Sequence, residues 1–233
     1  MLPQVAKLEG IALDFLFPQS CIACGRTGNF ICASCRETLI PLAPPLCPLC
    51  GRPNSTTALC PDCREWQAQI DGIRSPYRYD GVMRRAVHEL KYRNLRALAP
   101  LLAAWLRDYL DANPLPIEVL VPIPLHPKRL RERGYNQSAL LARELGRLMN
   151  MPVVEDCLVR RRHTLPQART ATVEERRRNI GDAFTCQNGK LKERKVLLID
   201  DVATSGTTLD ACAGAMKSAG ASSVWGLVSA REI

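Results

Sequence analysis

Eight of the eleven cysteines lie between residues 21 and 63, where they form four C-x2-C pairs. Two such pairs place four sulfur atoms around one point, which is the tetrahedral thiolate shell that zinc prefers. Eight ligands complete two shells and leave no open coordination position, so we expect two structural zinc sites. The pairs are Cys21 with Cys24, Cys32 with Cys35, Cys47 with Cys50, and Cys60 with Cys63.

The spacing of these cysteines leaves alternatives open. A redox dithiol and an iron–sulfur cluster also use closely spaced cysteines. Pairing in chain order is the simplest arrangement and resembles a double zinc ribbon, whereas interleaved pairing also satisfies the spacing. Segment 21–64 holds few large apolar side chains. Zinc binding of about 10–16 kcal/mol would therefore supply folding free energy that a small core lacks.

A second pattern capable of chemistry is the stretch 196–209, which reads VLLIDDVATSGTTL. Its apolar beginning predicts a buried strand over 196–199. Asp200 and Asp201 follow that strand, at the edge where ligands bind in open α/β sheets. Two adjacent carboxylates suit a vicinal diol, with Mg2+ nearby to offset their charge.

Small residues, four of them with hydroxyl groups, surround one glycine directly after the two aspartates. A helix is expected over 207–219, so free backbone N–H groups at its N-terminus favour a phosphate. The absence of a Gly-Lys-Ser/Thr sequence excludes a P-loop here. A diol site beside a phosphate site indicates a ribose 5-phosphate ligand. This phosphate loop consists of Ala203, Thr204, Ser205, Gly206, Thr207 and Thr208.

Basic residues concentrate in the middle of the chain. The formal net charge is +9, and residues 121–180 contain 13 Lys and Arg against 6 Asp and Glu. Such an excess suits an anionic partner, either a phosphorylated small molecule or nucleic acid. Lys128, Arg129 and Arg133 closely follow an apolar segment. Cations of this kind suit a pyrophosphate, which arginine can bind bidentately.

Apolar periodicity predicts the elements that must position these residues. Strands are expected at 73–79, 119–121, 196–199 and 224–228, and helices at 82–90, 98–110, 136–149 and 207–219. This alternation indicates an α/β fold with a mainly parallel sheet flanked by helices. We divide the chain into a cysteine-rich module with a short N-terminal helix (1–70) and a larger domain (71–233).

The sequence also bears on location. No apolar run approaches the roughly 20 residues that span a membrane. The apolar stretch 11–17 is interrupted by Asp14 and is not followed by a small-residue cleavage site. We therefore expect a cytoplasmic protein, in which thiols stay reduced. Cys157, Cys186 and Cys212 are scattered, and we expect them to be small buried apolar residues.

Taken together, these patterns resemble the ComF family, which includes competence protein F and the GntX-type proteins. The resemblance spans nearly the whole chain, and stretch 196–209 matches the 5-phosphoribosyl-1-pyrophosphate (PRPP) signature of type I phosphoribosyltransferases. It implies a small zinc-ribbon module followed by a type I phosphoribosyltransferase-like fold. The other motifs that carry it are Leu90–Tyr92, Val121–Pro124, Arg131–Gln137, Pro166–Gln167 and Glu175–Asn179.

The resemblance implies a role for each part of the larger domain. Asp200 and Asp201 would hold the ribose hydroxyls, and the phosphate loop would hold the 5-phosphate. Pyrophosphate would bind in the loop after Pro124, and the basic stretch 160–169 would form a flap over the substrate. The implied reaction uses PRPP with Mg2+, transfers the phosphoribosyl group to an acceptor that the sequence does not name, and releases pyrophosphate.

One residue departs from a well-known branch of these enzymes. Those that act on 6-oxopurines carry a carboxylate in the phosphate loop that assists the base. Thr204 stands at the matching position, and a threonine hydroxyl cannot act as a base near neutral pH. The resemblance therefore disfavours a 6-oxopurine acceptor.

A non-catalytic function stays open beside the enzymatic one. The ribose-phosphate pocket would then be a sensor or a vestige, while the zinc module and the basic surface engage single-stranded DNA or a protein partner in DNA uptake. The low aromatic content of 5% leaves little stacking surface for a dedicated single-strand binder. Zinc-mediated oligomerisation is a third hypothesis.

Overall fold

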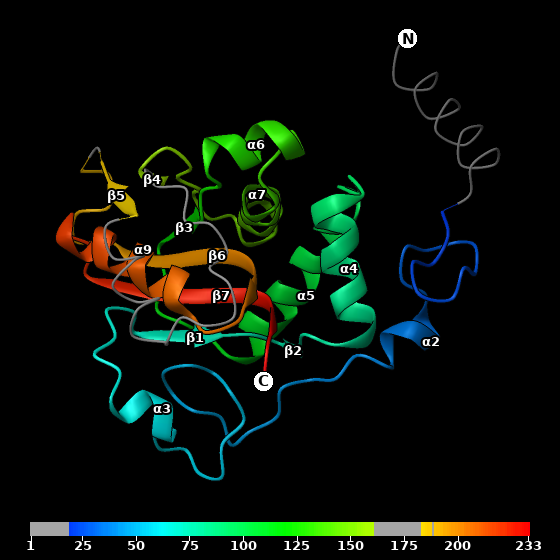
Figure 1. Cartoon of the computed structure of the whole chain (residues 1–233), viewed down its shortest axis with the longest axis horizontal. Helices are drawn as coiled ribbons and strands as arrows, with labels where there is room; N and C mark the ends of the chain where they lie inside the picture. The colour runs from blue at the N-terminus through cyan, green and yellow to red at the C-terminus, as the bar shows by residue number, and fades with distance from the viewer. Residues whose placement is uncertain (1–18, 161–182, 188) are drawn as a thin grey trace.

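The computed structural model describes residues 19–160, 183–187 and 189–233. Its centre is a five-stranded parallel sheet in the order β1–β7–β6–β3, with β2 also paired to β7 (Figure 1). This topology confirms the expected α/β class. The strands of this sheet are β1 (Gly72–Arg74), β2 (Tyr77–Arg78), β3 (Val119–Pro122), β6 (Lys195–Ala203) and β7 (Ser223–Arg231).

Helices cover both faces of the sheet. One face packs on α4 (Gly81–Tyr92), α5 (Leu98–Ala112) and α7 (Gln137–Met149). The other face packs on α9 (Thr207–Ser218) and on a small antiparallel ladder. That ladder pairs β4 (Leu158–Arg160) with β5 (Phe184–Cys186).

Strand β6 is buried on both sides, which explains its continuous apolar run. Leu197 and Ile199 belong to the core on the α4, α5 and α7 side. Val196 and Leu198 belong to the core on the α9 side. All four side chains are fully buried, as is usual for central strands of parallel sheets.

The cysteine-rich segment docks on the sheet domain at two separate places. Its first half contains α2 (Ala33–Arg36), and Ile31 and Leu39 join the core of α4 and α5. Arg85 of α4 also donates hydrogen bonds to the carbonyl oxygens of Ile22 and Ala23, at 3.0 and 2.9 Å.

The second half of this segment joins the core on the α9 side. It contains α3 (Pro61–Arg64), and its four cysteines pack with Trp66, Ile70 and Ile73. The two halves therefore contribute to different cores, each with its own set of helices. The division of the chain at residues 70 and 71 stays a prediction.

The structure differs from the expected elements in three places. The strand expected over 73–79 is two strands, β1 and β2, separated by Ser75 and Pro76. Strand β6 continues beyond residue 199 to Ala203, because it stays paired with β7 up to Arg231. The basic cluster after Pro124 forms a helix, α6 (Pro127–Arg133), that apolar periodicity did not indicate.

Some expectations fall on other parts of the chain. The N-terminal helix, the flap beyond Arg160 and the motifs at 166–167 and 175–179 lie outside the described residues. Within the described ranges, no helix combines the length and the apolar character needed to cross a bilayer.

Candidate functional site

The carboxyl ends of β3 and β6 meet at one edge of the sheet. The two strands are parallel neighbours, with Pro122 opposite Ile199. The chain leaves β3 toward α6, and it leaves β6 through the phosphate loop into α9. The phosphate loop and the basic residues of α6 therefore follow neighbouring strand ends, where ligands bind in such sheets.

The phosphate loop turns sharply at Gly206, which precedes α9 with φ of 85°. A Cβ at this position would lie 2.8 Å from Cδ1 of Ile73 and 3.2 Å from Cη2 of Trp66. Glycine is thus required both for the backbone conformation and for the close packing. The hydroxyl oxygens of Ser205 and Thr207 lie 2.7 Å apart, so the loop is already ordered by its own side chains.

A single small pocket unites most of the residues that the sequence singled out for a ribose phosphate. All six residues of the phosphate loop and Asp200 line it, and so do Val202 and Leu209. The N-terminus of the 12-residue helix α9 forms one wall. The pocket therefore combines a carboxyl group, hydroxyl donors and the backbone N–H groups of a helix N-terminus, a set that suits a phosphorylated diol.

Asp200 is held in this pocket by α7. The hydroxyl of Ser138, in the first turn of α7, donates a hydrogen bond of 2.7 Å to Oδ1 of Asp200. Burial and the charge of Asp201 raise the pKa of Asp200 to about 7, against the lowering effects of Lys91 and Ser138. The Asp200 carboxyl group therefore changes its protonation state near neutral pH.

Asp201 lies in a different environment from Asp200. Its side chain is 2% exposed, and its Oδ1 forms an ion pair of 2.7 Å with Nζ of Lys91 on α4. Burial alone would lower the pKa of Lys91, but the charges of Asp201 and Asp200 raise it above the ordinary value. The two aspartates, expected to bind one diol together, thus have different partners. Their ligand roles stay predictions.

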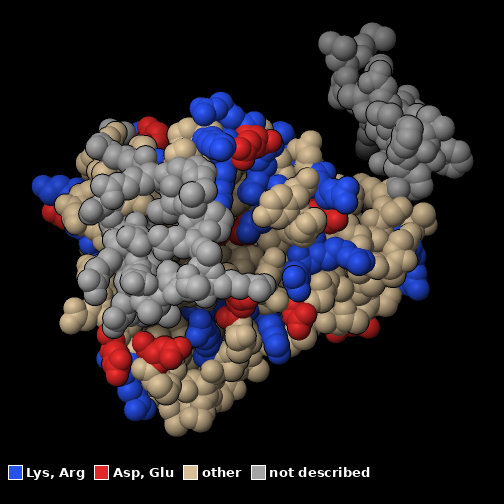
Figure 2. Space-filling view, in the orientation of Figure 1, with Lys and Arg blue, Asp and Glu red and all other residues tan. Residues whose placement is uncertain are grey.

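A basic cleft of about 580 Å³ lies beside this ion pair. Its lining includes Lys91, Arg96, Arg129 and Arg133, together with Tyr92 and Tyr135. Figure 2 shows Lys and Arg side chains gathered over α6 and toward α4. Arg129 and Arg133 of the expected pyrophosphate set thus lie in this cleft, whereas Lys128 is exposed outside its lining.

The motif at residues 131–137 shapes this region. Gly134 ends α6 in the left-handed conformation, with φ of 79°. Tyr135 is buried, and its hydroxyl donates to the carbonyl oxygen of Leu90 on α4. Asn136 begins α7 by accepting from the backbone N–H of Ser138, and it donates to the carbonyl oxygen of Ile123. The motif therefore fixes α6 and α7 relative to β3 and α4.

The eight paired cysteines form two clusters in chain order. We call Cys21, Cys24, Cys32 and Cys35 the first cluster, and Cys47, Cys50, Cys60 and Cys63 the second cluster. In each cluster all four sulfur atoms lie within 4.8 Å of one another.

Sulfur distances fit a tetrahedral metal site. Cys24 Sγ lies 3.6 Å from Cys32 Sγ, and Cys50 Sγ lies 3.7 Å from Cys60 Sγ. Zn–S bonds of 2.3 Å give a tetrahedral edge of about 3.8 Å. Both clusters therefore fit zinc, and the geometry selects sequential over interleaved pairing.

Known proteins match both parts of the chain. Residues 12–64 match the model for a double zinc ribbon domain, and residues 133–231 match the model for a phosphoribosyl transferase domain. Competence protein ComFC of Bacillus subtilis is 33% identical over 77% of this chain and 74% of its own length. The chain belongs to the ComF family.

Other ComF relatives agree with this assignment. Competence protein F of Haemophilus influenzae is 30% identical over 87% of this chain and 91% of its own length. The DNA utilization protein YhgH of Escherichia coli K12 is 28% identical over 77% of this chain and 81% of its own length. Among solved structures, that of a glutamine PRPP amidotransferase from B. subtilis is 15% identical and covers 56% of this chain and 26% of its own chain. Its TM-score of 0.38 is too low to support a conclusion.

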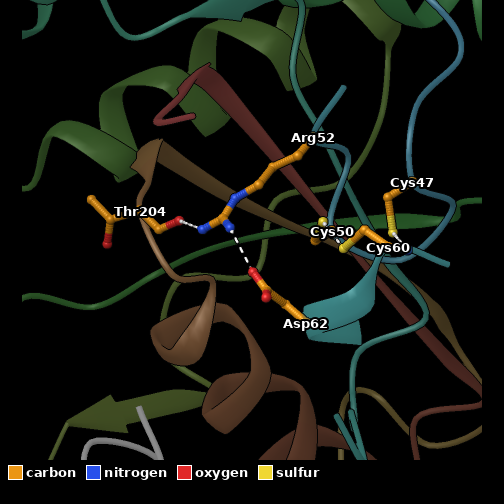
Figure 3. Close-up of polar contacts among 6 residues, drawn as sticks. All are labelled: Cys47, Cys50, Arg52, Cys60, Asp62 and Thr204. Carbon is orange, nitrogen blue, oxygen red and sulfur yellow. Dashed lines mark hydrogen bonds and ion pairs between the residues drawn. The ribbon is translucent and has the colours of Figure 1, made fainter. Parts of the chain in front are cut away.

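Three residues at this ComF site had no individual role in the sequence analysis. Lys91 and Ser138 contact the two aspartates from helices on one face of the sheet. Arg52, from the second half of the cysteine-rich segment, donates to the carbonyl oxygen of Thr204 at 3.1 Å (Figure 3). Lys91 stands in the Leu90–Tyr92 motif, beside the apolar stripe of its helix, which is a signal for a buried ionic role. Nothing local marks Ser138 or Arg52.

The raised pKa predicts that Asp200→Asn stabilises the protein more at pH 8 than at pH 5 without Mg2+. Folded Asp200 titrates near pH 7, whereas an unfolded aspartate titrates near about 3.9, so folding takes up a proton between these values. The wild type therefore loses stability as pH rises through this window, and the asparagine variant is spared that loss. Urea unfolding midpoints at the two pH values measure the difference.

Asp111→Asn is the matched control, because Asp111 is an exposed residue of α5. It removes the same formal charge away from the site. If Asp200→Asn changed the stability by the same amount at pH 5 and pH 8, the raised pKa of Asp200 would be contradicted.

Proposed function

We propose that this ComF protein binds the ribose 5-phosphate part of PRPP, with Mg2+, at the carboxyl end of β6. The observation that carries the proposal is the shared pocket of Asp200, the phosphate loop and the N-terminus of α9. A group that accepts hydrogen bonds from a diol and groups that donate to a phosphate lie together there. The matched phosphoribosyl transferase model covers this region.

Each part of the pocket has a role in this proposal. Backbone N–H groups and hydroxyls of the phosphate loop donate to the 5-phosphate. Asp200 accepts from the ribose hydroxyls, and Asp201, ion-paired with Lys91, completes the acidic pair beside it. Mg2+, when bound with the donor, would offset charge between the carboxylates and the pyrophosphate.

The basic cleft extends the proposal to group transfer. Arg129 and Arg133 line it next to Lys91, and Lys128 is exposed on the same short helix. These cations suit the pyrophosphate, whose negative charge grows as it leaves. In that reaction the bond from the anomeric carbon to the pyrophosphate oxygen breaks. A nucleophile of the acceptor bonds to the same carbon and gives up its proton.

Calorimetric titration of the zinc-loaded protein with PRPP and Mg2+ tests this function. We expect binding that weakens on omission of Mg2+, and weaker binding of ribose 5-phosphate. Asp200→Asn should weaken PRPP binding at least tenfold, because a neutral amide loses charge-assisted bonds of about 1.5–3 kcal/mol. Asp111→Asn should leave the affinity unchanged. No PRPP binding by the wild type would refute the proposal.

A second candidate function, binding of single-stranded DNA, is favoured by the basic cleft itself. Tyr92 is 66% exposed, a surface on which a base can stack. The guanidinium of Arg133 lies 5.4 Å from the centre of its ring, and that of Arg96 lies 4.4 Å from the ring of Tyr135. Relatives named for competence and DNA utilization fit this candidate.

Single-stranded DNA binding through this cleft predicts a steep dependence on salt. Each phosphate contact releases counterions and makes the slope of log K against log salt more negative by about 0.7 for single strands. Arg96→Ala and Arg129→Ala should each make the slope less negative by about that amount. Arg107→Ala on α5, whose side chain pairs with Asp111, is the control. A wild-type slope near zero would remove this candidate.

A further inference from the structure

Arg231 is a buried arginine without an obvious counter-ion. It ends β7 opposite Ala203, and it is 1% exposed. Among the residues that the structure describes, no carboxylate or carbonyl oxygen accepts a hydrogen bond from its three guanidinium nitrogens. An uncompensated charge in the core is strongly unfavourable, so this side chain needs a nearby negative charge.

The second cysteine cluster is the source of negative charge beside Arg231. Arg231 Nη1 approaches the Cβ position of Gly206 together with Ile73 and Trp66, and those two residues share a core with the four cysteines. Burial and the charge of Arg52 lower the pKa of the Arg231 guanidinium, whereas Cys50 and Cys63 raise it. All four cysteines of this cluster are buried. Four thiolates and one Zn2+ carry a net charge of about −2, so a metal-loaded cluster matches the neighbouring arginines.

Two arginines connect the second cluster to the phosphate loop. Arg52 donates to the carbonyl oxygen of Thr204 at 3.1 Å and to Oδ2 of Asp62 at 3.2 Å, and Asp62 stands next to Cys63 in α3 (Figure 3). Arg231 Nη1 would lie only 3.7 Å from a Cβ placed on Gly206. The loop is therefore contacted at Thr204 and closely approached at Gly206 by side chains that border the cluster.

We propose that the metal–thiolate charge of the second cluster is the counter-ion of Arg231, and that Arg231 and Arg52 hold the phosphate loop in its binding conformation. Arg231 is then a positioning residue. The inference rests on the proposed function only for the identity of the ligand. Metal at the second cluster and phosphate at the loop must then strengthen each other's binding by the same factor. The first cluster is tied to α4 instead, through Arg85.

The linkage is tested in the unaltered, zinc-loaded protein. Zinc release to a colorimetric chelator is followed with and without saturating ribose 5-phosphate, and with inorganic phosphate. We expect the ligand to slow release of one zinc equivalent at least fivefold and to leave the other unchanged. Cys24→Ser removes a ligand of the first cluster and should speed release of its zinc, so the zinc equivalent that is unaffected by this substitution belongs to the second cluster. Unchanged release of both equivalents, while calorimetry shows ribose 5-phosphate bound, would overturn the linkage.

The counter-ion role is tested by substitution of Arg231. Arg231→Met removes the charge at similar volume, and we expect release from the second cluster at least ten times faster, with release from the first unchanged. Arg231→Lys keeps the charge, and its rate of zinc release from the second cluster should lie between those of the wild type and Arg231→Met. Arg85→Met is the matched control and should leave the second cluster unchanged. If Arg231→Met released zinc from the second cluster at the wild-type rate, the pairing of Arg231 with this cluster would be overturned.

These outcomes separate the inference from the proposed function. If the wild type binds no ribose phosphate, the proposed function fails, and the zinc release rates still decide the pairing of Arg231 with the cluster. If Arg231→Met does not fold, Arg231→Gln, which removes the charge but keeps a polar side chain, decides the pairing. Release of zinc from the second cluster at the wild-type rate in Arg231→Gln would then overturn it.

Discussion

The carboxyl end of β6 buries charge, and each buried charge depends on a partner from another part of the chain. Asp201 is closed off from solvent and pairs with Lys91 of α4 at 2.7 Å. Asp200, the next residue, receives its hydrogen bond from Ser138 of α7. A buried charge without such a partner is costly, so the helices on this face must be in place before the site is stable.

The second half of the cysteine-rich segment also reaches this edge of the sheet. The first half of this segment packs with α4 and α5, and the second half packs with α9. Arg52 of the second half contacts Thr204 directly, so the double zinc ribbon borders the phosphate loop. In our proposal the second cluster also supplies the charge that Arg231 lacks. A zinc module would then be part of the binding site as well as a structural support.

Local patterns made much of this molecule predictable from sequence. A C-x2-C pair brings two sulfurs together within one turn, so the metal ligands follow from spacing. Fully apolar runs identify β3 and β6, and the phosphate loop follows from adjacent residues around Gly206. Helix α6 was missed because its short sequence has no apolar stripe to mark it.

Contacts between distant residues could not be predicted in the same way. The extension of β6 to Ala203 depends on its pairing with β7. Arg52 and Thr204 are 152 residues apart, and Lys91 meets Asp201 only once α4 packs on the sheet. Such partners carry no local signal, and they are the residues that decide how the two aspartates differ.

Hydrogen–deuterium exchange tests the central claim, a ribose-phosphate site at the carboxyl end of β6, most directly. The zinc-loaded protein is compared with and without PRPP and Mg2+. With a ribose phosphate bound there, we expect slower exchange in peptides that span residues 200–209, with little change in α5. Slowing confined to α4 and α6, or none at 200–209 under conditions where PRPP is bound, would contradict it.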